Sequence, residues 1–137
     1  MMKPKFVDLY SDIADRVGQM SHATRAKVGA VIVKDDTIIS YGYNGMPRGW
    51  PNDCEIDGAT RPEVLHAESN AIAKLARGPA SGFGADMFVS YSPCIECAKL
   101  IAQTGIRKVW YRQQYRDTAG IDFLRQSSIE VVQKSSD

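Results

Sequence analysis

Two short stretches contain the residues best suited to chemistry. The first, HAESNAI, places His66 and Glu68 two positions apart at the start of an apolar pattern with helical spacing. The second, SPCIEC, places Cys94 and Cys97 three positions apart, so a helix would carry both thiols on one side. The positive end of the helix dipole favours thiolates there. Because thiolates and imidazoles are preferred zinc ligands, the two stretches together predict a metal site.

We expect an open site rather than a closed one. Three protein ligands, His66, Cys94 and Cys97, would hold one zinc ion per chain and leave a fourth position for water. Glu68 is then expected to accept a proton from that water and to deliver it to a substrate nitrogen. This arrangement is typical of catalytic zinc.

Other interpretations of the same residues stay open. A C-x-x-C pair can be a redox dithiol, and zinc can stabilise a nucleotide-binding module that has no catalytic activity. In a closed structural site Cys54 would be the fourth ligand, which leaves no role for Glu68. Cys54 lies in a segment rich in proline and glycine, so a free thiol near the site or a packing residue is the simpler interpretation. His22 is expected at the surface.

The overall composition limits the class of protein. A chain of 137 residues with 44% hydrophobic and 24% charged residues predicts one globular domain spanning 1–137. A net charge of +1 gives no reason to expect a polynucleotide or a membrane as partner. The sequence shows neither a membrane-spanning apolar run nor a signal peptide. Three cysteines, an odd number, argue against a disulfide framework, so we expect a reducing, cytoplasmic location.

The elements that must position the site follow from the apolar pattern. Ser92 is expected to cap the helix that carries the cysteines, and Pro93 suits its first turn. The segment from Gly45 to Leu65 is expected to be a long loop, which in a compact domain is usually functional or disordered. Helices are predicted at 6–18, 67–76, 94–104 and 118–126, and strands at 28–33, 37–43, 87–91, 108–111 and 129–132.

The order of these elements predicts an α/β fold with one five-stranded mixed sheet and helices on both faces. The first two strands should form an antiparallel hairpin through the turn Lys34-Asp35-Asp36. The later strands, each reached by a helix, should be parallel. The N-termini of those helices would lie along one edge of the sheet, where α/β proteins bind ligands.

The chain resembles the deoxycytidylate (dCMP) deaminases of the cytidine deaminase-like zinc superfamily. The zinc nucleobase deaminase signature H-x-E…P-C-x-x-C is present as HAE at 66–68 and PCIEC at 93–97. Further matching stretches are VGAVIV, GYNGMPRG, PCIECAKLI and YRDTAGIDFL. The resemblance covers about residues 25–130 and is weaker over 50–65. It implies a three-layer α/β/α fold.

The resemblance also implies an activity, the hydrolytic conversion of dCMP to dUMP with release of ammonia. Glu68 would act as general acid and base. The backbone N–H of Ala67 and the carbonyl of Ser92 would hold the edge of the base, and Asn44 would contact the sugar or the base. A turn formed by Asn44 and Gly45 is an equally good interpretation of that asparagine.

A monophosphate substrate needs cations or hydrogen-bond donors. Arg25 and Lys27 come just before the first strand, and Tyr115 and Arg116 follow the fourth. Each can equally be a solvated surface residue. Tyr115 and Arg116 gain weight because they belong to a stretch that matches the family.

The family resemblance further implies nucleotide regulation and assembly. It implies activation by dCTP, accompanied by Mg²⁺, and inhibition by dTTP, with the effector at Gly42, Tyr43, Asn44 and Gly45, although these glycines can simply serve a turn. It implies a homo-oligomer, with a hexamer favoured. A single zinc is expected, because the chain lacks the extra histidines with which some viral relatives bind a second. A tRNA adenosine deaminase, or another cytosine-type deaminase, shares the zinc ligands and is the alternative enzyme.

Overall fold

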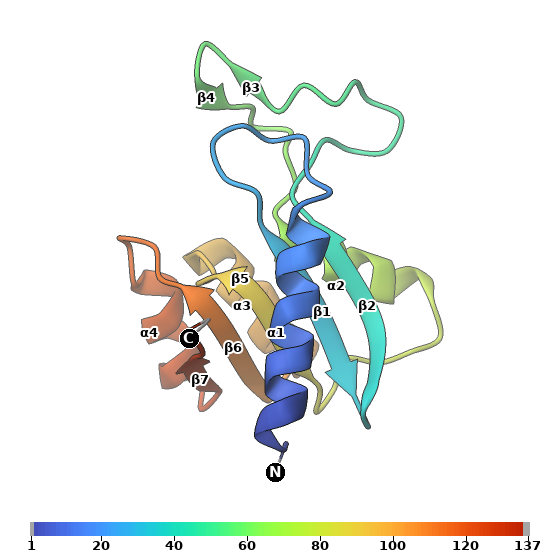
Figure 1. The fold of residues 1–137 in the computed structure, drawn as a ribbon, viewed down its shortest axis with the longest axis vertical. Helices are drawn as coiled ribbons and strands as arrows, with labels where there is room; N and C mark the ends of the chain where they lie inside the picture. The colour runs from blue at the N-terminus through green and yellow to red at the C-terminus, as the bar shows by residue number, and fades with distance from the viewer. Residues whose placement is uncertain (1, 136–137) are drawn as a thin grey trace.

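The computed structural model describes residues 2–135. Within this range the chain forms four helices and seven strands, shown in Figure 1. In chain order they are α1 (Pro4–Gly18), β1 (Gly29–Lys34), β2 (Thr37–Tyr43), β3 (Glu55–Ile56), β4 (Ala59–Thr60), α2 (Ala67–Arg77), β5 (Asp86–Tyr91), α3 (Ile95–Thr104), β6 (Lys108–Gln113), α4 (Ala119–Gln126) and β7 (Glu130–Gln133).

Five strands form one mixed sheet in the order β2-β1-β5-β6-β7. β1 is antiparallel to both β2 and β5, whereas β5, β6 and β7 run parallel to one another. The predicted antiparallel hairpin and the predicted parallel half are both confirmed. β3 and β4 form a separate two-stranded ribbon in the segment that extends beyond the end of the sheet (Figure 1).

The helices form two layers around the sheet. On one face α1 packs through Val7 and Ala14 against Val31 and Phe88 of the central strands. The other face carries α2, α3 and α4, whose buried side chains include Ile101 and share a second core with the sheet. The central strands β1 and β5 are buried along nearly their whole length, in keeping with the apolar runs Ala30–Val33 in β1 and Met87–Val89 in β5. The expected three-layer α/β/α fold is confirmed.

Two tight turns depend on backbone with positive φ. Asp35 and Asp36, at φ 50° and 59°, connect β1 to β2. Asp57 and Gly58, at φ 53° and 78°, connect β3 to β4 in the same way. Positive φ at both central residues is the type I′ conformation, which matches the twist of the two strands. The prediction of an unbroken loop from Gly45 to Leu65 was therefore wrong.

A glycine allows the start of α2 to approach the sheet. A Cβ built on Gly42 of β2 would lie 2.6 Å from both the carbonyl oxygen of Ala67 and the amide nitrogen of Ala71. Since real Cβ atoms do not come this close to backbone, no larger residue fits at this position without a shift of α2. The close contact places the first turn of α2 against the end of β2.

The helix that carries the cysteines begins later than predicted. Its N-cap is Cys94, and α3 starts at Ile95. Ser92 lies too far upstream to cap it, and its Oγ instead accepts a hydrogen bond from the backbone N–H of Tyr115 at 2.9 Å. The prediction that Ser92 caps the helix was therefore wrong. In the described part of the chain, no helix combines the length and the apolar character needed to cross a bilayer.

Candidate active site

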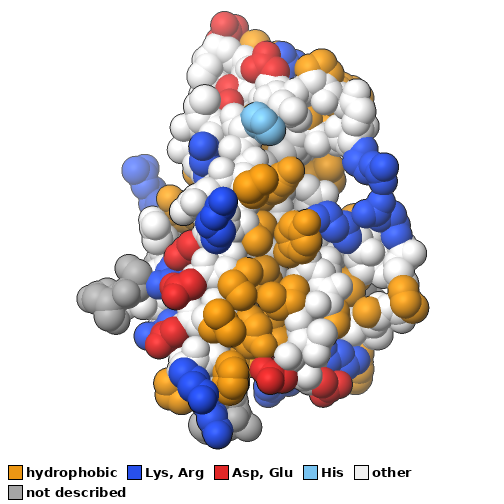
Figure 2. Space-filling model, turned by 45° about the vertical axis from the view of Figure 1, so that its right-hand side comes forward, with side chains coloured by type: hydrophobic (Ala, Val, Ile, Leu, Met, Phe, Trp, Pro, Cys, Tyr) orange, Lys and Arg blue, Asp and Glu red, His pale blue; other side chains and the backbone are white. Residues whose placement is uncertain are grey.

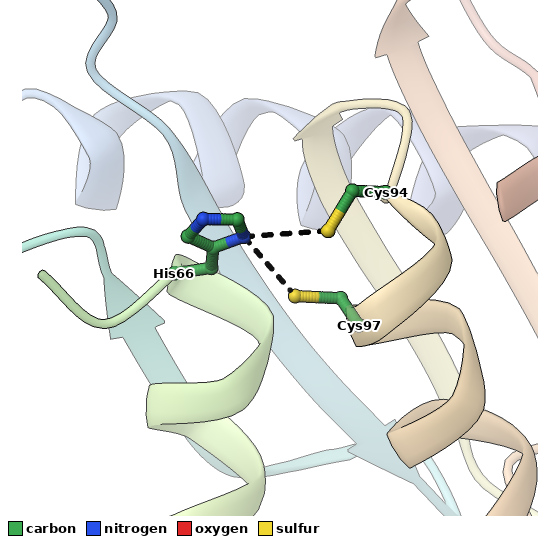
Figure 3. A group of neighbouring side chains, drawn as sticks. All are labelled: His66, Cys94 and Cys97. Atoms are coloured by element: carbon green, nitrogen blue, oxygen red, sulfur yellow. Dashed lines mark hydrogen bonds between the residues drawn. The ribbon is translucent and has the colours of Figure 1, made fainter. Parts of the chain in front are cut away.

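Three side chains from two helices meet at the predicted metal site (Figure 3). His66 is the N-cap of α2 and Cys94 the N-cap of α3, while Cys97 lies in the first turn of α3. The Nδ1 atom of His66 lies 3.5 Å from the Sγ of Cys94 and 3.3 Å from the Sγ of Cys97. Neither N-cap side chain caps its own helix. Both instead point into the space between the helices.

These separations fit zinc. Zn–N and Zn–S bonds of about 2.1 and 2.3 Å at tetrahedral angles put nitrogen and sulfur roughly 3.5 Å apart, and two sulfurs roughly 3.8 Å apart. Within residues 2–135, the ligand atoms of His66, Cys94 and Cys97 form a group in which all lie within 4.8 Å of one another, and Cys54 is not part of it. The closed site with Cys54 as fourth ligand is contradicted by this geometry.

The protonation of the three ligands also favours a cation. A hydrogen bond from the Cys97 thiol, followed by the contact with His66, lowers the pKa of Cys94 to about 3. The bond to Cys94 and burial raise the pKa of Cys97. The hydrogen bond to Cys94 raises the pKa of His66. The group therefore holds an anionic sulfur that shares protons with its neighbours, and a divalent cation can replace those protons.

Glu68 is buried beside this group. It lies on the first turn of α2, and only 4% of its surface is exposed. Burial raises the pKa of its carboxyl to about 7. A carboxyl group with a pKa near the working pH can both take up and release a proton, as a general acid–base residue must. The Glu68 side chain therefore lies inside the protein and not in solvent.

A cavity of about 490 Å³ lies next to the metal group and is large enough for a small ligand. Its walls come from the segment before β1, from the β3–β4 ribbon, from the first turns of α2 and α3, and from the loop after β6. Of the predicted site residues, it brings together Arg25, Asn44, His66, Ala67, Glu68, Cys94 and Tyr115.

Other predicted residues do not line this cavity in the described structure. Ser92 is fully buried, and Arg116 is exposed after Tyr115. Lys27 is also exposed and lies outside the lining. Gly42, Tyr43 and Gly45 are outside the lining as well, and only Asn44 of the predicted effector stretch reaches it.

Asn44 fixes the backbone at the entry of β1. Its Oδ1 accepts the N–H of Val28 at 2.9 Å, and its Nδ2 donates to the carbonyl oxygen of Ala26 at 2.8 Å. Ala26 and Val28 both line the cavity. Asn44 therefore shapes one wall, and a direct contact between Asn44 and a substrate stays a prediction.

Tyr115 forms an aromatic wall of the cavity. Its ring stacks on that of Tyr91 with centroids 5.0 Å apart. Burial, followed by the negative charge of Glu68, raises the pKa of the Tyr115 phenol to about 12. The phenol therefore stays neutral at physiological pH and offers an aromatic surface and a hydroxyl group rather than a base.

The sequence analysis did not identify two polar residues of the cavity, Glu55 and Thr60. They are direct cross-strand partners in the β3–β4 ribbon. The signal that could have found them is the dipeptide Asp57-Gly58, because Asp-Gly favours a two-residue hairpin turn. A hairpin at that point would have paired Glu55 with Thr60.

The similarity of this chain to known proteins supports this interpretation of the site. Residues 4–113 match the family model described as the cytidine and deoxycytidylate deaminase zinc-binding region. The chain is 37% identical to the deoxycytidylate deaminase of Enterobacteria phage T4, with 87% of this chain and 84% of that protein covered. It is also 37% identical to an uncharacterized deaminase of Aliivibrio fischeri, with 96% and 95% covered.

A solved structure is similar along nearly its whole length. The crystal structure of dCMP deaminase from the cyanophage S-TIM5 in complex with dCMP and dUMP superposes with a TM-score of 0.96 at 45% identity. The match covers 98% of this chain and all of the phage chain (100%). Family, relatives and fold agree with the His-Cys-Cys group and the adjacent buried carboxylate, and the chain belongs to the cytidine and deoxycytidylate deaminase zinc-binding family.

Proposed function

We propose that this chain catalyses the hydrolytic deamination of dCMP to dUMP with release of ammonia. The observation that supports it most directly is the position of Glu68, buried in the wall of a cavity that His66 and Cys94 also line. A purely structural zinc site does not need a buried carboxylate at this place. The matched proteins named as deoxycytidylate deaminases support dCMP as the substrate.

The reaction forms a C4–O bond on the cytosine ring and breaks the C4–N4 bond. Zinc held by His66, Cys94 and Cys97 would supply a Lewis acid that makes water a competent nucleophile near neutral pH. Glu68 takes a proton released as water is consumed, protonates N3 of the ring, and then delivers a proton to the departing amino group. Its pKa of about 7 suits both directions of transfer.

The remaining cavity residues would bind and orient the nucleotide. The N–H of Ala67 opens α2 and so has no acceptor within the helix, which leaves it free for the base. The side chain of Asn44 and, outside the lining, the carbonyl of Ser92 are further proposed contacts with the base and sugar. Arg25 lines the cavity and is our first candidate for the 5′-phosphate, and Tyr115 lines the same cavity. Arg116 is exposed beside Tyr115 and is the second candidate.

A substrate panel tests the proposal. Purified, zinc-loaded protein is incubated with dCMP, CMP, deoxycytidine or a tRNA anticodon stem, and ammonia and product are measured. We expect dCMP to have the highest kcat/KM. Preferred turnover of the anticodon stem would support the tRNA adenosine deaminase alternative. Absence of turnover with one tightly bound zinc would support a nucleotide-binding module, and absence of zinc under reducing conditions would support a dithiol redox protein.

We also propose nucleotide regulation, with dCTP and Mg²⁺ activating and dTTP inhibiting. Its support is the family resemblance of the stretch Gly42–Gly45. This stretch contacts both α2 and the entry of β1: the Tyr43 carbonyl accepts from Asn70, and the Asn44 amide binds Ala26 and Val28. An effector there would act on two walls of the cavity. Saturation curves for dCMP with each nucleotide test this proposal, and unchanged curves contradict it.

A homo-oligomer, with a hexamer favoured, belongs to the same proposal. Figure 2 shows apolar side chains gathered on one face of the molecule. The exposed apolar side chains include Leu9 of α1 and Ile38 and Tyr41 of β2, which are 46%, 38% and 51% exposed. Contiguous apolar surface of this kind supports self-association. Light scattering on the protein as it elutes from a size-exclusion column measures its molar mass and therefore the number of subunits.

A further inference from the structure

The two cross-strand partners of the β3–β4 ribbon contact Arg25 at its two ends. The Oε2 atom of Glu55 accepts the backbone N–H of Thr24 at 3.0 Å and that of Arg25 at 3.3 Å. The Oγ1 atom of Thr60 accepts a hydrogen bond from Nη1 of Arg25 at 3.3 Å. The ribbon therefore holds both the backbone and the guanidinium of Arg25, although it lies about thirty residues further along the chain.

The way in which Glu55 binds leaves the charge of Arg25 available. The Glu55 carboxylate contacts backbone N–H groups, and among residues 2–135 no ion pair joins the Arg25 guanidinium to a carboxylate. The partner of the guanidinium is a neutral hydroxyl. Since a guanidinium has five N–H donors, four stay free for an anion.

The turn between the strands keeps these contacts in register. Asp57 and Gly58 both have positive φ, which closes the hairpin and places Glu55 opposite Thr60. Although desolvation opposes it, hydrogen bonds from the backbone of Thr24 and Arg25 lower the pKa of the Glu55 carboxyl. The carboxylate is therefore ionised at neutral pH and accepts both N–H groups in its stronger, charged form.

We propose that Glu55 and Thr60 are positioning residues, which hold the Arg25 guanidinium towards the cavity so that it binds the 5′-phosphate of the substrate. This inference rests on the proposed function, because it assigns the phosphate of that substrate to Arg25. The ribbon then contributes to selection of a nucleotide over a nucleoside without touching the reacting base. Arg25, Glu55 and Thr60 all line the same cavity as His66 and Glu68.

Equilibrium binding of the product dUMP tests the inference without turnover. Titration calorimetry is performed on zinc-loaded wild-type protein and on the variants Glu55→Ala, Thr60→Val and Arg25→Ala. We expect each variant to bind dUMP at least about tenfold more weakly, because each weakens or removes the charge-assisted contact between the Arg25 guanidinium and the 5′-phosphate. For dCMP, KM should rise by a larger factor than kcat falls, because the reacting groups are untouched.

A double-mutant cycle separates positioning from a general structural role. Adding Glu55→Ala or Thr60→Val to Arg25→Ala should weaken dUMP binding by less than about twofold more, since the positioned group is already absent. The full single-variant loss in the Arg25→Ala background would overturn the inference, and so would unchanged binding in the single variants. Glu63→Gln is the matched control: this exposed carboxylate of the same segment makes no side-chain hydrogen bond or ion pair among residues 2–135.

The outcomes distinguish this inference from the proposed function. Wild-type protein that binds dUMP but does not deaminate dCMP contradicts the proposed function and leaves the cycle fully interpretable. If the wild-type protein deaminates dCMP but the Glu55→Ala and Thr60→Val variants bind dUMP as tightly as the wild type, only the inference is contradicted. Unfolding midpoints and zinc content of each variant are measured beside binding, and Thr60→Val, which preserves side-chain shape, decides the case if Glu55→Ala is unstable.

Discussion

The Sγ of Cys94 lies 3.5 Å from Nδ1 of His66, although the two residues are 28 positions apart and belong to different helices. Each is the N-cap of its helix, so the N-termini of α2 and α3 converge on one point. Both helix dipoles favour negative charge there, and the thiolate of Cys94 provides it. The metal group therefore depends on how α2 and α3 pack as much as on the ligands themselves.

Replacement of one ligand should release the metal. We expect Cys97→Ser to weaken zinc binding by more than about 100-fold, since even residues that only support a metal ligand are worth about 10–100-fold. The variant should also unfold at lower denaturant concentration, because metal binding contributes to folding free energy. Elemental analysis after dialysis against a mild chelator, with a urea unfolding curve, measures both effects.

Cys54→Ala is the control for that substitution. Cys54 is buried and free but lies outside the metal group in the described structure. The control variant should keep one zinc per chain and should lose only packing energy. Loss of zinc from Cys54→Ala, or full retention by Cys97→Ser, would contradict the three-ligand site.

Removal of the proton carrier should abolish activity while the metal stays bound. Glu68→Gln keeps the size of the side chain but cannot exchange a proton, so we expect kcat for dCMP to fall by about 10²–10⁴-fold. Zinc content should be unchanged, because Glu68 is not a ligand in the His66, Cys94 and Cys97 group. Steady-state kinetics and elemental analysis on the same sample measure the two quantities.

A second carboxylate serves as the matched control for Glu68. Glu96 lies in the first turn of α3, as Glu68 does in α2, but it is exposed and pairs with Lys99 at 2.9 Å. Glu96→Gln should therefore leave kcat within about twofold of the wild type. An equal loss in both variants would show that acidity near the helix N-termini matters generally and that Glu68 is not the carrier.

Much of the fold followed from local patterns in the sequence. The predicted bounds of β2 at 37–43 agree with the structure, and α2 differs only by one residue at its end, Arg77. The metal group was also predictable, because its ligands occur in two short motifs at helix starts. In both cases the signal lies within a few consecutive residues, either as an apolar periodicity or as the spacing of ligands. Tertiary contacts do not change the structure that this local signal predicts.

The rest depends on contacts between distant segments. The partner of the Ser92 hydroxyl is the backbone of Tyr115, 23 positions away, and no local pattern shows that this contact replaces helix capping. The two strands of the β3–β4 ribbon are only two residues long each, too short for any alternating pattern. The hydrogen bonds of Glu55 with the backbone of Thr24 and Arg25 likewise join segments about thirty residues apart, so no local pattern predicts them.

A methyl group added at Gly42 of β2 should displace α2 and so disturb the active site. We expect Gly42→Ala to lower the free energy of unfolding by roughly 1–3 kcal/mol, a typical range for overpacking. The added Cβ would lie 2.6 Å from the backbone at Ala67 and Ala71, so α2 must shift. Because α2 carries His66 and Glu68, kcat for dCMP should fall as well. Urea unfolding and kinetics measure the two effects.

Gly45→Ala is the control for this substitution. A Cβ on Gly45 would meet no atom within 4 Å, and its φ is not positive, so the unfolding free energy should change by less than about 0.5 kcal/mol. Equal destabilisation by the two variants would indicate that backbone flexibility around β2, rather than the contact with α2, sets the cost.

The contact between Glu55 and the loop before β1 should weaken in acid. Hydrogen bonds from the backbone of Thr24 and Arg25 outweigh desolvation and hold the pKa of Glu55 below its ordinary value of 4.5. A carboxyl with a depressed folded-state pKa contributes stability that is fully present above its ordinary pKa and is lost as pH falls through the lower value. The contact should therefore persist from neutral pH down to 4.5 and open only below it.

Amide proton shifts of Thr24 and Arg25 followed by NMR against pH should show a midpoint below 4.5 that is absent in Glu55→Gln, where other acid-induced changes remain. A midpoint at or above 4.5, or the same titration in the variant, would contradict this assignment.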